Sequence, residues 1–163
     1  MMRTLMLTAA LAACLAAAPA APAAPADPVA WKLQNPPVAF VKAGAVFHVK
    51  LLAQVQDGWH LYSLKPMTEG PIATRIWIAE GQPFSLSGAV RAPEPRVMQD
   101  PSFGMEVELY EGEAVFTLPV RVAPGTAPGV QKLVVSASYQ SCNNKLCLPP
   151  KTVKVEVPIT IGK

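Results

Sequence analysis

The sequence is poor in the side chains on which most nucleic-acid-binding and metal-binding proteins depend. Among its 163 residues are two histidines, three cysteines and 15% charged residues, with a formal net charge of +3. That charge is too small for a nucleic-acid-binding protein, and the basic residues form no stripe. After the first 28 residues, no apolar run approaches the ~20 residues of a membrane-spanning helix. We therefore expect no nucleic-acid partner and no span within the folded part.

Metal ligands are also scarce. His48 and His60 with a single close cysteine pair do not supply the two ligand pairs of a structural zinc site. The methionines Met67, Met98 and Met105 are scattered and form no M-x-M motif. We expect no metal and no cofactor, and metal handling stays open only as a third hypothesis. Metal content after purification under reducing conditions tests it.

The first 20 residues have the pattern of a secretory signal. A short positive start, Met1–Arg3, precedes the apolar, Ala-rich segment Thr4–Ala18, and an A-x-A sequence ends at Ala20. A second processing route is open, because Leu11–Cys14 resembles a bacterial lipoprotein box. Cys14 would then carry lipid and attach the protein to a membrane; otherwise the protein is released. On either route the protein is exported, and we expect it in the periplasm.

Composition divides the remaining chain into two parts. Residues 21–29 are mostly Ala and Pro, which cannot bury a core, and are typical of a semi-extended linker. Residues 30–163 suit one domain that buries roughly two-thirds of its unfolded surface. We place the domain boundary at residue 30.

The domain shows the period of β-strands and no helical period. Residues 45–56 and 113–122 alternate cleanly between apolar and polar, and Pro119 suggests an edge position for the second. Residues 91–104 contain three prolines and are expected to form a long loop. Further strands are predicted at 59–64, 73–80, 84–90, 106–110, 133–139 and 152–161. Short strands separated by Pro/Gly turns predict an all-β, immunoglobulin-like antiparallel sandwich.

Cys142 and Cys147 lie in a polar loop between the last two strands, at one end of a hairpin. Thiol–disulfide exchange needs one thiolate that attacks a disulfide and a second cysteine that resolves the mixed disulfide. The pair satisfies the proximity condition. Its short ring is a weak staple, worth only ~2 kcal/mol in the loop-entropy model. Spacing alone leaves both a redox pair and a structural clip open.

The segments around this pair carry a resemblance. Tyr139–Cys142 (Tyr-Gln-Ser-Cys) and Cys147–Pro150 (Cys-Leu-Pro-Pro) resemble the active-site segment of the N-terminal periplasmic domain of the thiol–disulfide interchange protein DsbD. Asp57–Tyr62 is similar to that family's glycine–aromatic–Leu–Tyr strand, and Asp100–Gly104 falls where the family has its cap loop. The resemblance extends over roughly residues 30–161.

The resemblance implies an immunoglobulin-like fold and a reductive role. The protein would take electrons from a thioredoxin-like donor and pass them to periplasmic disulfide isomerases or other thiol proteins. Cys147 would form the mixed disulfides and Cys142 would resolve them. The cap and the active-site environment would be formed by Phe103, Asp100, Tyr62, His60 and Tyr139.

The sequence departs from the family at several positions, and three of the proposed site residues also have simpler interpretations. The cysteines are one residue closer than in the well-known member, and Pro101 and Ser102 replace an acid and an aromatic. In the simpler interpretations, His60 is an exposed strand residue, Tyr62 packs against neighbouring strands, and Asp100 starts a turn. The rival function is a non-enzymatic immunoglobulin-like binding or scaffold domain with a structural disulfide. A redox titration separates the two.

Overall fold

The computed structural model describes residues 26–33 and 40–163. The predicted signal, the lipoprotein box and residues 21–25 of the predicted linker lie outside these ranges. The described residues form strands and no helix. No helix among them is therefore long and apolar enough to cross a membrane. The strands are β1 (Val29–Leu33), β2 (Val41–Lys42), β3 (Val46–Val55), β4 (His60–Tyr62), β5 (Arg75–Ile78), β6 (Phe84–Leu86), β7 (Arg96–Asp100), β8 (Met105–Tyr110), β9 (Glu113–Val122), β10 (Gly129–Tyr139), β11 (Ser141–Cys142) and β12 (Lys151–Gly162).

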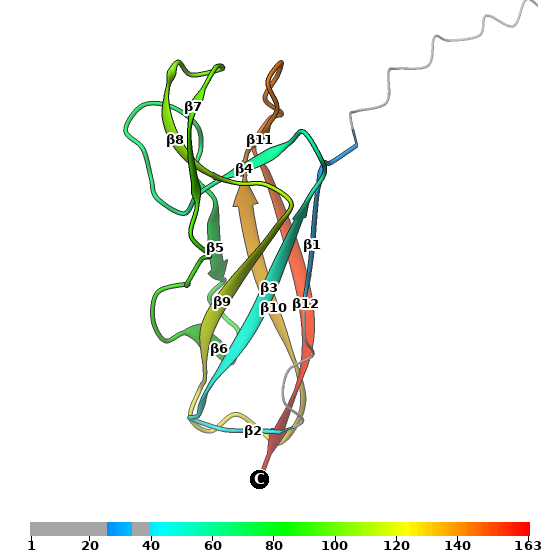
Figure 1. Cartoon of the computed structure of the whole chain (residues 1–163). Coiled ribbons are helices and arrows are strands. Elements are labelled where there is room, and N and C mark those ends of the chain that lie inside the picture. The colour runs from blue at the N-terminus through cyan, green and yellow to red at the C-terminus, as the bar shows by residue number, and fades with distance from the viewer. Residues whose placement is uncertain (1–25, 34–39) are drawn as a thin grey trace, which may run out of the picture.

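Two sheets form the sandwich. One has the order β1-β3-β9-β6, and the other has the order β2-β12-β10-β5 (Figure 1). Every second residue of β3 and β9, and of β10 from Leu133 onward, is apolar and buried, which is the alternation expected when one sheet face meets a core. The fold class is therefore the predicted all-β, immunoglobulin-like sandwich.

A third sheet, β11-β4-β8-β7, positions the cysteine pair. The β7–β8 hairpin and the turn after β11 project from the same end of the molecule (Figure 1). Leu61 of β4 and Tyr110 of β8 pair with each other and are buried in the main core. Because neighbouring strand residues point to opposite faces, Tyr62 and Leu109 face away from that core. The second face is thus free to build a separate site.

The predicted loop over residues 91–104 is wrong in its second half. Arg96–Asp100 is strand β7, which pairs with the whole of β8 except Tyr110. Pro95 and Pro101 flank β7 rather than interrupt it. The strand is at the sheet edge, where one side of its backbone needs no partner. Proline therefore limits the strand at both ends without preventing it.

The fold begins slightly before residue 30. Strand β1 starts at Val29, and the carboxylate of Asp27 accepts hydrogen bonds from the Val29 amide and the Tyr139 hydroxyl, at 3.0 and 2.5 Å. Lys151 Nζ lies 2.7 Å from the same carboxylate. These contacts attach the first described residues to the β10–β12 hairpin.

Candidate functional site: a disulfide on the end sheet

The two cysteines lie directly opposite each other in a small hairpin. Cys142 and Cys147 form a disulfide with a Cα–Cα distance of 4.0 Å. The Asn143 amide donates to the Leu146 carbonyl on one side of the pair. This arrangement is that of a non-hydrogen-bonded cross-strand pair, in which side chains are closest. The loop predicted from sequence is therefore a tight extension of β11.

The turn between the cysteines is held by one side chain. Oδ1 of Asn143 accepts hydrogen bonds from the amides of Lys145 and Leu146, at 2.8 and 2.9 Å. An Asn that binds the backbone two residues on stabilises a turn without help from neighbouring strands. The cysteine separation is thus set locally, by the sequence between the two sulfurs.

The two sulfurs differ in their access to solvent. The side chain of Cys142 is fully buried, whereas Cys147 is partly exposed. The adjacent Leu146 is 47% exposed. Cys147 is therefore the more accessible cysteine of the pair, and it lies beside an apolar side chain on the surface.

Strand register brings two predicted site residues to the same face as Cys142. Cys142 pairs with His60 across β11 and β4, and Tyr62 follows two residues later on β4. Residues i and i+2 of a strand point to the same face. Tyr62 and Cys142 indeed belong to one buried cluster with Val107 and Leu109.

His60 is buried, contrary to the interpretation of it as an exposed strand residue. It is 4% exposed, and its Nε2 lies 3.2 Å from the Tyr62 hydroxyl and 3.5 Å from Oδ2 of Asp100. The Tyr62 hydroxyl donates to the same carboxylate oxygen over 2.6 Å. Since the single hydroxyl proton is used by Asp100, the network assigns the N–H of a neutral His60 to Nε2, as donor to the Tyr62 oxygen.

Burial determines the ionisation of this group of three. Desolvation lowers the pKa of His60 below its usual range, and the Asp100 carboxylate opposes that shift without cancelling it. Desolvation, assisted by the bond to Asp100, raises the pKa of Tyr62. At neutral pH His60 is therefore a neutral imidazole and Tyr62 a neutral phenol.

Phe103 is close to this group. Its ring meets the Tyr62 ring edge to face, with centroids 6.1 Å apart, and it packs against the cluster that contains Cys142. The loop that carries it is anchored by Asp100, whose Oδ1 accepts from the Ser102 amide at 2.7 Å and whose carbonyl accepts from the Gly104 amide at 2.8 Å. Asp100 thus both starts the loop and binds the Tyr62 hydroxyl.

Tyr139 is not brought to this cluster. Its side chain lies in the main core, where its ring is 5.3 Å from that of Trp31, and its hydroxyl binds Asp27. Burial and the bond to Asp27 raise its pKa. Only its position three residues before Cys142 associates it with the pair.

Sequence reasoning did not place five apolar residues in this site. They are Val107 and Leu109, which are buried, and Met67, Met98 and Met105, which pack against them. The apolar–polar alternation of residues 106–110 indicates a strand. It does not show which residues of other segments pack against that strand. Among the described residues, no three His, Cys, Asp or Glu side chains gather as a metal site.

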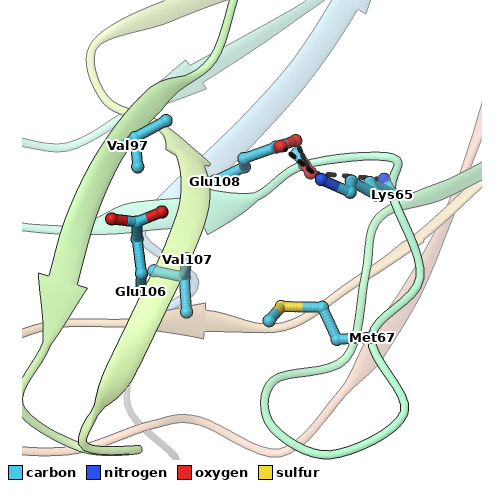
Figure 2. A pocket seen from close by; sticks show the side chains of 7 residues that line it. Lys65, Met67, Val97, Glu106, Val107 and Glu108 are labelled. Atoms are coloured by element: carbon cyan, nitrogen blue, oxygen red, sulfur yellow. Dashed lines mark hydrogen bonds and ion pairs between the residues drawn. The ribbon is translucent and has the colours of Figure 1, made fainter.

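A separate pocket lies along β8. It has a volume of about 100 Å³ and is lined by Ser63, Lys65, Met67, Val97, Glu106, Val107 and Glu108 (Figure 2). Lys65 Nζ and Glu108 Oε1 form an ion pair across it at 2.8 Å. Neither cysteine lines this pocket.

Comparison with known proteins gives a family. No curated protein matches the sequence. The reduced N-terminal domain of DsbD from Neisseria meningitidis superposes with a TM-score of 0.51 at 19% identity, over 72% of this chain and 82% of that one. The N-terminal periplasmic domain of ScsB from Proteus mirabilis superposes with a TM-score of 0.47 at 17% sequence identity, over 81% of this chain and 45% of that one. The family described as "Thiol:disulfide interchange protein DsbD, N-terminal" matches residues 31–159, and the chain belongs to it.

Proposed function

We propose that this protein exchanges thiols and disulfides through Cys142 and Cys147 in the periplasm. It would carry reducing equivalents from a thioredoxin-like donor to oxidised thiol proteins such as disulfide isomerases. Family membership and the modest size of the disulfide ring support this function. The observation that carries it is the asymmetry of the pair, in which Cys142 is fully buried and Cys147 is partly exposed.

The asymmetry supports an order of steps. A donor thiolate attacks Sγ of Cys147, the Cys142–Cys147 bond breaks, and Cys142 leaves as a thiolate that takes up a proton. The second donor thiolate then attacks the donor sulfur of the mixed disulfide, so that the donor is oxidised and Cys147 is released. Delivery to an oxidised partner is the same sequence reversed, with Cys147 as the nucleophile.

A buried thiolate at Cys142 is costly, so its thiol proton should leave only as Cys142 attacks the mixed disulfide. His60 lies directly opposite Cys142, and Nδ1 of its neutral ring can accept a proton. We assign to His60 the acceptance of the Cys142 proton in that step, and to Tyr62 and Asp100 the orientation of the imidazole. When a donor reduces the pair, the proton that the Cys142 thiolate takes up comes from solvent. Phe103 would limit access to the pair until a partner displaces it, which protects the dithiol from chance oxidation.

One experiment separates exchange from a structural clip. The purified domain is equilibrated with graded ratios of reduced and oxidised dithiothreitol, and the fraction of free thiols is measured. A structural bridge has a potential below about −300 mV, whereas an exchange pair is poised nearer to its thioredoxin-like donor. A value in the structural range, together with no reduction by a thioredoxin-like protein, contradicts the proposal and leaves the scaffold function.

A further inference from the structure

The chain segment that carries Cys147 is the outermost part of the end sheet. β11 is at the edge of that sheet, and Cys147 joins it through an isolated bridge to Cys142. Beyond the bridge, the Leu148 amide donates to the Ser141 carbonyl at 2.9 Å. Among the described residues, no further strand pairs with this segment. The position of Cys147 therefore depends strongly on the turn that connects the two cysteines.

Asn143 makes three hydrogen bonds within this turn. Its backbone amide donates to the Leu146 carbonyl at 2.9 Å. Its Oδ1 accepts from the amides of Lys145 and Leu146, at 2.8 and 2.9 Å. None of these bonds involves an atom of a cysteine. The turn therefore has its own fastening, which does not require the disulfide.

A turn that persists after reduction would keep the two thiols ready to react. The cysteines are five positions apart, and their Cα atoms are separated by 4.0 Å across the bridge. A short flexible tether gives the second group an effective concentration of only about millimolar. Groups held in a reactive geometry reach effective concentrations that are higher by orders of magnitude. What holds the turn thus decides how efficiently Cys142 meets Cys147.

We propose that Asn143 is a positioning residue that keeps the reduced pair in the arrangement of the disulfide. The inference rests on the proposed function, because it concerns the step that resolves the mixed disulfide. In that step Sγ of Cys142 attacks Sγ of Cys147, the bond between Cys147 and the partner breaks, and the partner sulfur leaves as a thiolate. The Cys142 proton passes to His60, and the partner has gained two electrons.

Positioning acts on the rate of this step and on the equilibrium. The held turn speeds resolution, and it favours the disulfide because the reduced pair has less freedom to lose when the bond forms. The reduced protein is then a stronger reductant. A neutral hydrogen bond contributes roughly a factor of two to ten. Loss of the two bonds to Oδ1 of Asn143 should therefore change both quantities by about tenfold.

The test follows the reaction of the reduced protein with the aromatic disulfide DTNB, which releases a coloured thiolate at each step. The first release reports the attack by Cys147, and the second reports resolution by Cys142. We expect Asn143→Ala to slow only the second release, by about tenfold. Its disulfide should be about tenfold less favoured against dithiothreitol, which raises the reduction potential by about 30 mV. Circular dichroism verifies that each variant is folded.

Two variants and one measurement on the wild type serve as controls. Asn143→Asp keeps an acceptor oxygen for the turn and should restore both quantities. Asn144 is exposed in the same turn, and its side chain makes no hydrogen bond within the described residues, so Asn144→Ala should behave as the wild type. In the reduced wild type, the amides of Lys145 and Leu146 should exchange their hydrogens more slowly than in a free peptide.

Four results overturn the inference. Asn143→Ala resolves as fast as the wild type, Asn143→Asp is as slow as Asn143→Ala, Asn144→Ala is equally slow, or the two amides exchange freely in the reduced wild type. Exchange with a thioredoxin-like donor is measured on the same wild-type sample. Normal exchange with any of these four results defeats only the positioning role. The expected DTNB results without exchange with the donor defeat only the proposed function.

Discussion

The Tyr62 hydroxyl donates a 2.6 Å hydrogen bond to Oδ2 of Asp100, a carboxylate that is 1% exposed. This bond joins β4, which is paired with the cysteine strand, to the start of the loop that carries Phe103. The bond thus ties the start of this loop to β4. If Phe103 limits access to the pair as proposed, access to the cysteines and the stability of this corner are coupled through this one hydroxyl.

Removing that hydroxyl tests the coupling. Tyr62→Phe leaves one oxygen of a buried carboxylate without its strongest donor, so we expect the free energy of unfolding to fall by about 1.5 to 3 kcal/mol. We also expect the reduced pair to react faster with iodoacetamide, because the Phe103 loop is less firmly held. Denaturant unfolding and alkylation rates measure the two effects.

Tyr110→Phe is the matched control. Tyr110 is also buried on this sheet, but its hydroxyl makes no hydrogen bond within the described residues. Its replacement should change both quantities little. Equal effects of the two substitutions would show that the bond to Asp100 does not hold the loop.

His60 makes stability depend on pH. Burial depresses its pKa in the folded state, and the unfolded chain has the ordinary value of about 6.5. As the pH falls through 6.5, the unfolded state binds a proton that the folded state does not, so stability decreases until the folded pKa is reached. We expect less stability at pH 5.5 than at pH 7.5, and a smaller difference in His60→Gln.

His48 provides the comparison for this effect. It is exposed on β3, so His48→Gln removes a histidine without disturbing the buried network around His60 and serves as the control. Denaturant midpoints at several pH values between 5 and 8 give the slopes. A His60→Gln profile that matches the wild type would mean that another group titrates in this window.

The strands and the cysteine pair could be predicted because each depends on local sequence. Alternation predicts β3, β9 and β12 closely, and the spacing of Cys142 and Cys147 indicates their pairing. The resemblance indicated Tyr62, Asp100 and Phe103, which the structure brings to the same corner. The methionines could not be predicted, because their gathering depends on the curvature of the β7–β8 hairpin and on the loop after β4.

The prediction of an edge position at Pro119 is wrong for a specific reason. Strand β9 is paired on both sides, with β3 and β6, so Pro119 is within a sheet. Regular pairing with β6 ends at Leu86, and beyond it the Ser87 amide donates to the Pro119 carbonyl. The side of Pro119 that lacks an N–H faces Ser87, just past the last paired residue of β6, so the proline falls where the regular ladder has already ended. Sequence shows the proline but not where the neighbouring strand stops.

The contacts of Asp27 should contribute to stability. Burial tends to raise its pKa, but bonds from Lys151, Tyr139 and the Val29 amide outweigh this, and the pKa lies below its ordinary range. Such a group stabilises the fold above its unfolded pKa and loses the effect as the pH falls through its folded pKa. Asp27→Ala should cost about 1 to 3 kcal/mol at pH 7.

Asp27→Asn keeps an acceptor for Tyr139 and removes the charge opposite Lys151. We expect it to be intermediate at pH 7 and to approach the wild type once the pH falls below the lowered pKa of the Asp27 carboxylate, where that group is protonated. Thermal unfolding at pH 7 and at a series of acidic pH values provides the measurement. No loss in either variant would place the start of the fold after this residue, at the boundary predicted from sequence.

The different exposure of the two cysteines gives opposite results for their serine variants. In Cys142→Ser, the surface Cys147 can still form a mixed disulfide with a partner, but no second thiol resolves it, so adducts should accumulate. In Cys147→Ser, the remaining thiol is buried, and adducts should be absent. Mixing each variant with an oxidised thioredoxin-like protein, followed by non-reducing electrophoresis and mass spectrometry, detects the adduct. Adducts confined to Cys147→Ser would reverse the assignment and make the buried sulfur the nucleophile, which requires the Phe103 loop to open before any exchange occurs.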